Sequence, residues 1–265
     1  MSKDAVLSKV PAVTLGFWII KILATTLGET GGDAVTMSWL GETTSEANPN
    51  GYLIGTAIFM TALIALIVLQ IRAKKFHPFL YWATIIASTT AGTTLADFAD
   101  RSLGIGYTGG SSVLLACVLI SLASWYWAEG TISVDTVNRP RVEAFYWLTI
   151  TFSQTLGTAL GDWMADTSGL GYLGAAAVFG AALAALAIGY YASSISRVGL
   201  FWAAFILTRP LGATVGDFFD KPFSKGGLNI DRPLATAIIT TAMLVGILLL
   251  PQRAGKHPST SASEI

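Results

Sequence analysis

Eight apolar stretches, each close to 20 residues long, constrain the fold of this 265-residue chain more than any other feature. About 20 apolar residues are needed for a helix to cross the hydrocarbon core of a bilayer. Charged residues make up only 12% of the chain, about half the share that is usual in soluble domains. The stretches lie at residues 12–36, 51–71, 78–100, 110–128, 143–165, 171–192, 198–219 and 233–251. They predict an all-α, polytopic membrane protein with eight transmembrane helices.

We expect one transmembrane domain over residues 1–252 and a disordered cytoplasmic tail over residues 253–265. Ten of the sixteen Lys and Arg residues fall in the two tails and in alternate connections, which by the positive-inside rule places both termini in the cytoplasm. A bacterial inner membrane is the expected location. The formal net charge of zero gives no argument for a nucleic-acid partner.

One motif recurs four times, as "GETGGD", "GTTLAD", "GTALGD" and "GATVGD", beginning at Gly28, Gly92, Gly157 and Gly212. Each repeat contains a motif-bearing span, an outer loop, a second span and a cytoplasmic connection, and the repeats cover residues 12–75, 78–135, 143–197 and 198–252. Two spans per repeat give all four repeats the same orientation, unlike the inverted repeats of many transporters. We expect the motif helices to gather around one axis.

Within each motif, counted from its glycine as position 0, small residues predict close packing and acids predict a ligand strip. Small residues at positions 0 and +4 allow two helix backbones to approach closely. The packing glycines are Gly28, Gly32, Gly92, Gly157, Gly161, Gly212 and Gly216. Position +5 is always aspartate, position +1 holds Glu29, Thr93, Thr158 or Ala213, and three further acids follow at +8 or +9. The candidate metal ligands are Glu29, Asp33, Asp97, Asp100, Asp162, Asp166, Asp217 and Asp220.

Two basic residues lie inside the predicted motif spans, Lys21 and Arg209. Charged side chains at this depth normally pair with one another or mark an ion pathway. Each is therefore either half of a structural salt bridge to a motif acid or a counter-charge that holds the acids when no cation is bound. An aromatic pair at the start of each motif span, such as Tyr81-Trp82, fits an interfacial belt.

The candidate ligands are oxygen atoms only, which suits hard cations such as Mg²⁺, Ca²⁺ or Mn²⁺, or protons. The sequence therefore predicts a cation transporter coupled to protons, rather than an enzyme, with no cofactor beyond a bound divalent cation. Its partners would be the bilayer and the transported metal cation or proton, and a homo-oligomer stays open. An organic cation is an alternative substrate, because Phe98, Trp163, Phe218 and Phe219 adjoin the acids. A structural or sensory protein locked by ion pairs is the second alternative.

Eight spans with a repeated T-L-G-x-x-x-G-D pattern resemble a bacterial family of uncharacterised membrane-anchored proteins, over about residues 10–252. This resemblance implies a fold but no function. The stretch from Gly28 to Asp33 is also similar to the E-x-G-D-[KR]-[TS] motif of Ca²⁺/Mn²⁺–proton exchangers. It differs from that motif by one extra residue between the acids and by Ala34 in place of the basic residue. The exchangers also carry two motif copies rather than four. The analogy favours Mn²⁺ or Ca²⁺ as the ion.

Overall fold

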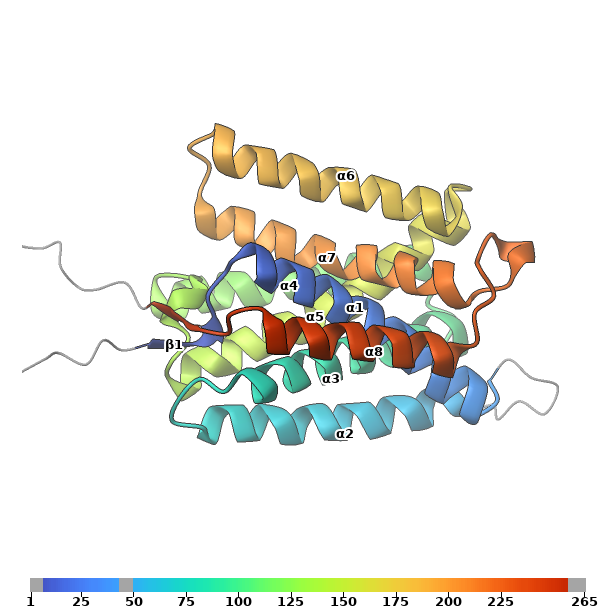
Figure 1. Ribbon diagram of the computed structural model, residues 1–265, viewed down its shortest axis with the longest axis horizontal. Coiled ribbons are helices and arrows are strands. Elements are labelled where there is room, and N and C mark those ends of the chain that lie inside the picture. The colour runs from blue at the N-terminus through green and yellow to red at the C-terminus, as the bar shows by residue number, and fades with distance from the viewer. Residues whose placement is uncertain (1–6, 43–49, 257–265) are drawn as a thin grey trace, which may run out of the picture.

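The computed structural model describes residues 7–42 and 50–256, and this part of the chain contains eight long helices (Figure 1). They coincide with the eight apolar stretches, so the all-α class is confirmed. Their bounds are α1 Leu15–Asp33, α2 Gly51–Arg72, α3 Pro78–Asp97, α4 Tyr107–Glu129, α5 Pro140–Asp162, α6 Gly171–Ala192, α7 Arg197–Asp220 and α8 Arg232–Leu249.

The four motif helices, α1, α3, α5 and α7, form a closed ring in which each contacts the next and α7 returns to α1. The remaining four, which we call the covering helices, pack outside this ring. Each covering helix lies against the motif helix of the following repeat: α2 on α3, α4 on α5, α6 on α7, and α8 back on α1. Figure 1 shows the covering helices α2 and α6 along opposite flanks of the molecule. The layer of covering helices therefore also closes, because α8 of the last repeat packs on α1 of the first.

The position-0 glycines set the spacing of the ring. A β-carbon at Gly28 would overlap the Thr89 hydroxyl of α3, and one at Gly212 would overlap the Thr25 hydroxyl of α1. A β-carbon at Gly92 would lie 2.9 Å from the backbone of Gln154 on α5, and one at Gly157 would overlap the side-chain stem of Arg209 on α7. In every case the glycine faces position −3 of the next repeat. Side chains at these four places would push neighbouring backbones apart.

The aromatic pairs at the starts of the motif helices form a second layer of contacts, which we call the aromatic collar. Its members are Phe17, Trp18, Tyr81, Trp82, Tyr146, Trp147, Phe201 and Trp202. Each pair meets the next around the ring, with ring centroids 5.6, 5.8, 6.2 and 5.7 Å apart. The hydroxyls of Tyr81 and Tyr146 are 2.7 Å apart and buried. The interfacial-belt interpretation is wrong for these residues, because all but Trp18 are buried in the protein core.

Five helices are long and apolar enough to cross a membrane: α2, α4, α6, α7 and α8. In the four covering helices, only 17–22% of the most apolar window is buried inside the protein, so their apolar surface faces outward. Contiguous exposed apolar surface of this kind belongs in a membrane. The helices α1, α3 and α5 are less apolar because they carry Thr, Ser, Gln and acidic residues, which are buried inside the ring of motif helices.

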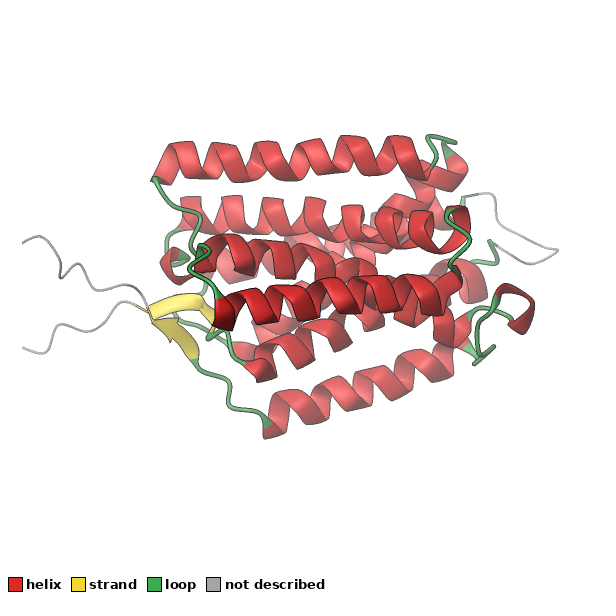
Figure 2. Cartoon of the chain, turned by 90° about the horizontal axis from the view of Figure 1, so that it is seen from above, coloured by secondary structure: helices red, strands yellow, loops and turns green. Residues whose placement is uncertain are grey.

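The N- and C-terminal segments meet at one end of the bundle, which we call the terminal end (Figure 2). Here β1 (Leu7–Pro11) pairs antiparallel with β2 (Ala254–Lys256). The start of the predicted disordered tail is therefore a strand, because β1 supplies its backbone hydrogen bonds; residues 257–265 lie outside the described residues. Nearby, Lys9 forms an ion pair with Glu143 at 2.6 Å and donates to the carbonyls of Gln70 and Ile71 at the end of α2.

At the opposite end, which we call the motif end, three motif helices change their winding directly after the +5 aspartate. Helix α1 continues as a π-helix over Ala34–Trp39, α3 over Phe98–Ser102 and α5 over Trp163–Thr167. Helix α7 instead stays α-helical to Asp220. Because π-helices are rare and concentrate at functional sites, their recurrence at one level marks this end of the ring.

Candidate functional site

The four +5 aspartates lie at the motif end of the ring and are buried, with exposures of 0–3%. They are Asp33 of α1, Asp97 of α3, Asp162 of α5 and Asp217 of α7. Buried carboxylates require partners, since an isolated charge removed from water is costly. The partners come from two places that carry a basic residue at position +9, Arg101 and Lys221.

Each of these two cations bridges two neighbouring repeats. Arg101 lies 3.0 Å from Asp97 of its own repeat and 3.2 Å from Asp162 of repeat 3. Lys221 lies 3.0 Å from Asp217 of its own repeat and 2.5 Å from Asp33 of repeat 1. The same bond pattern therefore links repeat 2 to 3 and repeat 4 to 1. The ion pairs give the ring a twofold arrangement, although the glycine contacts repeat four times.

One turn toward the terminal end, the +1 residues gather around Arg209, which is fully buried. Its Nη2 donates to Glu29 Oε2 at 2.8 Å and to Thr93 Oγ1 at 2.6 Å, and also to the Thr158 hydroxyl. The fourth +1 residue, Ala213, lies on the same helix as Arg209. Arg209 itself occupies position −3, which in the other repeats is Thr25, Thr89 or Gln154. One exceptional residue thus connects four helices.

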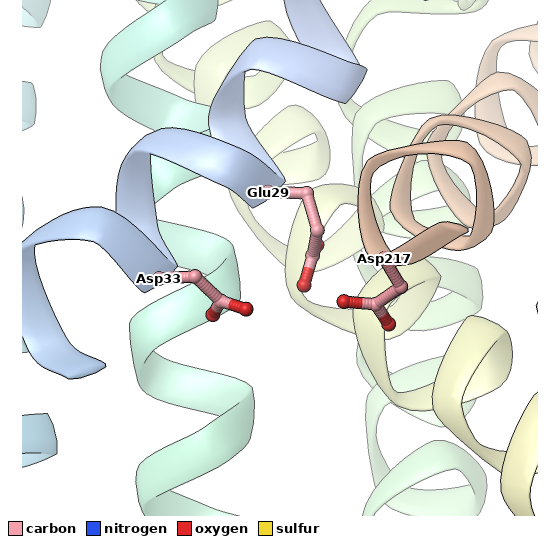
Figure 3. A group of neighbouring side chains, drawn as sticks. All are labelled: Glu29, Asp33 and Asp217. Carbon is pink, nitrogen blue, oxygen red and sulfur yellow. The ribbon is translucent and has the colours of Figure 1, made fainter. Parts of the chain in front are cut away.

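Three of the predicted ligands come close enough to hold one ion. Glu29, Asp33 and Asp217 each offer a carboxylate oxygen, and these atoms all lie within 4.8 Å of one another. Figure 3 shows the three side chains pointing toward one another from α1 and α7. All are buried, and Asp33 Oδ1 has no hydrogen-bond partner among the described residues. The Lys221 ammonium already contacts two of the three, so a metal ion here would compete with it.

The three later acids differ from one another in their surroundings. Asp220 is 5% exposed and contacts Lys221 at 3.9 Å and Arg232 at 3.3 Å. Asp100 packs against Gly110 in the first turn of α4, where the helix dipole favours a carboxylate. Asp166 is exposed and accepts from the hydroxyls of Tyr107 and Tyr172. At position +9, after the change to π-helix, Asp166 therefore lies at the surface, apart from the three predicted ligands that converge.

Lys21 also departs from its predicted role. It has no ion pair with a motif acid in the described part of the chain, and its Nζ lies 4.2 Å from the centre of the Phe205 ring. It is nevertheless fully buried. The reason is its depth: Lys21 lies two helical turns before Gly28, below the level of the carboxylates. Arg209, in contrast, does pair with Glu29.

Acids outnumber bases at the motif end. Seven buried carboxylates lie there: Glu29, Asp33, Asp97, Asp100, Asp162, Asp217 and Asp220. The cations within ion-pair distance of them are Arg101, Arg209, Lys221 and Arg232. Because opposite charges do not balance, the site can accept additional positive charge, either as protons or as a metal cation.

Sequence reasoning set Arg101 and Lys221 against the carboxylates as a group without pairing them with particular acids, and it missed Arg232. A signal for the first two was present: repeats 2 and 4 share D-F-x-D followed by a basic residue, over residues 97–101 and 217–221. That pattern distinguishes the even repeats from the odd ones. No comparable signal marks Arg232, which reaches Asp220 from the start of α8.

Comparisons with known proteins agree with the repeat architecture. The family described as "Repeat of Unknown Function (DUF347)" matches the chain four times, over residues 16–76, 80–131, 145–196 and 200–254. Searches of curated proteins and of solved structures found no match. The four matches follow the four repeats of the ring and cover most of its length, and the chain belongs to this family of repeat proteins of unknown function.

Proposed function

We propose that this protein transports a divalent cation of the Mg²⁺, Ca²⁺ or Mn²⁺ class across a membrane, in exchange for protons. The convergence of Glu29, Asp33 and Asp217 carries the proposal. Three carboxylate oxygens within one coordination sphere, with no His or Cys among them, match the preference of hard cations for oxygen ligands. The hydroxyls of Thr93 and Thr158 add further oxygen atoms, one helical turn closer to the terminal end.

The resident cations give the site a way to release its ion. Lys221 bridges Asp33 and Asp217 by a flexible side chain, so it can swing away when a divalent cation enters and return when the ion leaves. Arg209 is fixed by three contacts and stays on Glu29. In this scheme Lys221 alternates with the substrate, and the carboxylates take up protons when the metal departs.

We infer that the cation enters from the motif end. A hollow of about 460 Å³ lies there, lined by Ser38, Asp220, Asn229 and Arg232 among others. Asp220 connects this hollow to Lys221, which is 3.9 Å away. Its acidic and polar lining suits a hydrated cation arriving from water, and the aromatic collar closes the opposite end of the ring.

The proposal includes the arrangement in the membrane. We infer that all eight helices cross the bilayer, with α1, α3 and α5 shielded from lipid by the covering helices. The motif helices contain 19–24 residues, which at 1.5 Å per residue spans about 30 Å. The positive-inside pattern orients both termini toward the cytoplasm of a bacterial cell and the carboxylates toward the outside.

Flux into proteoliposomes tests this function. Reconstituted protein with a metal-sensitive dye inside should accumulate Mn²⁺ when a proton gradient is applied. Glu29→Gln and Asp217→Asn should each lower the rate at least tenfold, because each removes one ligand charge. Asp166→Asn is the matched control and should leave the rate unchanged, since Asp166 lies at the surface. Equal flux in all four proteins would remove these carboxylates from the pathway.

A specific observation favours a second function, that of a non-transporting protein locked by ion pairs. All four +5 aspartates contact Arg101 or Lys221, which is what a purely structural role requires. This candidate predicts no flux of any divalent cation from well-folded protein. The organic-cation alternative stays a prediction, and Phe218, one of the aromatic residues beside the acids, packs with Tyr172 and Phe179 of α6.

A further inference from the structure

The buried polar atoms of the motif helices that lack a partner are of two kinds, acceptors on one side of Arg209 and donors on the other. Toward the motif end, the oxygens that have neither a hydrogen bond nor an ion pair belong to carboxylates: Asp33 Oδ1 and Asp100 Oδ1. Toward the terminal end, as far as the aromatic collar, the atoms without a partner belong to groups that can donate. These are Lys21 Nζ, Thr149 Oγ1, Ser153 Oγ and the side-chain amide of Gln154. Buried polar groups without a protein partner normally hold an ion or ordered water.

Among these donors, Lys21 has the greatest need of a partner, because it is the one that can carry a full charge. It is 0% exposed, and its ammonium has no hydrogen-bond partner among the described residues. The face of the Phe205 ring, 4.2 Å away, attracts the ammonium but accepts no conventional hydrogen bond. An ammonium with three donors in this position lacks both a counter-charge and acceptors.

Arg209 lies between the carboxylates and the donor groups and contributes to both. Its Nη2 contacts Glu29, Thr93 and Thr158, whereas its Nε and Nη1 are buried without a partner. The stem of Arg209 packs on Gly157, and Gln154 lies one helical turn before that glycine on α5. Helices α1, α5 and α7 thus place free donors in the same stretch of the ring.

On the terminal side of the carboxylates, a charged Lys21 would lack a counter-charge, and burial disfavours a charged group that lacks one. Glu29 pairs with Arg209, and Lys21 has no acid within ion-pair distance in the described part of the chain. One negative charge would complete the balance. We propose that a small monovalent anion of the halide class binds between Lys21 and Arg209, with the Gln154 amide and the Ser153 hydroxyl as additional donors. This site is separate from the carboxylate site and does not depend on cation transport.

Thermal unfolding of the purified protein in detergent tests the site with chloride as the probe. Sodium gluconate is replaced stepwise by sodium chloride at constant ionic strength. A ligand that binds only the folded state raises Tm by an amount that grows with the logarithm of its concentration above Kd, by roughly 5–10 °C when its concentration is 100 times Kd. Lys21→Met should abolish the chloride dependence, and Lys21→Arg should keep it. Asp217→Asn is the matched control and should also keep it, because Asp217 belongs to the carboxylate site.

Two results would overturn the proposal. The first is a wild-type Tm that does not change between gluconate and chloride, which would leave Lys21 without an anion. The second is an equal chloride effect in the wild type and in Lys21→Met, which would identify a general salt effect. If Lys21→Met does not fold, Gln154→Leu replaces it, and its affinity for chloride should fall at least tenfold. Unchanged affinity in that variant would contradict the site as described.

Discussion

At the scale of single residues, the site depends on a few departures from fourfold symmetry. Position −3 is Thr, Thr, Gln and Arg in successive repeats, and position +1 is Glu, Thr, Thr and Ala. Because the ring brings equivalent positions together, one Arg on α7 reaches Glu29, Thr93 and Thr158 simultaneously. The alanine at 213 and the arginine at 209 lie on the same helix, so the largest and the smallest of these side chains share a repeat.

Lys221 provides the sharpest residue-scale prediction. Lys221→Met leaves Asp33 and Asp217 buried without their cation, and breaking a buried ion pair costs about 3–5 kcal/mol. We expect Tm to fall in EDTA and to recover when Mn²⁺ is added, by more than in the wild type, because the competing ammonium is gone. Arg139→Met, at an exposed pair with Glu129, should change stability by less than about 1 kcal/mol. A Lys221→Met protein that is insensitive to Mn²⁺ would argue against the metal site.

At the scale of elements, four close contacts hold the motif helices together. Each position-0 glycine accommodates the −3 residue of the next helix, and the collar aromatics repeat the same stepwise contact two to three turns away. Contacts at two levels in the same direction make neighbouring motif helices parallel. Parallel packing then brings the four aspartates to one end, where their mutual repulsion requires Arg101 and Lys221.

A matched pair of glycine substitutions tests this spacing. Gly28→Ala places a methyl group on Thr89 and should destabilise the fold by about 1–3 kcal/mol, because the neighbouring helix must move. Gly180 of α6 has open space around it, so Gly180→Ala should change the unfolding free energy by less than about 1 kcal/mol. Denaturation in SDS–detergent mixtures measures both. Similar stabilities for the two variants would show that the ring tolerates wider spacing at this level.

At the scale of the whole molecule, the polar helices lie inside and the apolar helices lie outside, as a bilayer requires. The motif helices, which hold the buried carboxylates, are the less apolar ones, and the more apolar covering helices pack around them. The last covering helix, α8, closes the circle on α1, and the two strands bring the chain ends together at the terminal end. A polar ring can therefore lie at bilayer depth without contact with lipid.

Labelling of single cysteines tests whether the polar helices cross the membrane. In a Cys117→Ser background, Lys75→Cys and Ser102→Cys flank α3, and both positions are exposed. A membrane-impermeant maleimide should label position 102 in intact cells and position 75 only after permeabilisation. Ser168→Cys and Ser194→Cys flank the strongly apolar α6 and provide the control pair. Labelling of positions 75 and 102 from the same side would contradict the crossing of α3.

The sequence by itself determined the eight helices, the four repeats and the levels of Gly28 and Asp33, because hydrophobic runs and motif spacing are local properties of the chain. Tertiary structure alone decided the pairings, since Lys221 and Asp33 are 188 positions apart and meet only when α7 closes on α1. It also separated Lys21 from the acids that sequence reasoning had assigned to it. The physical reason is that the partner of a buried charge depends on its depth in the bundle and on which helix lies beside it. Helix packing fixes both, whereas residue spacing along the sequence fixes neither.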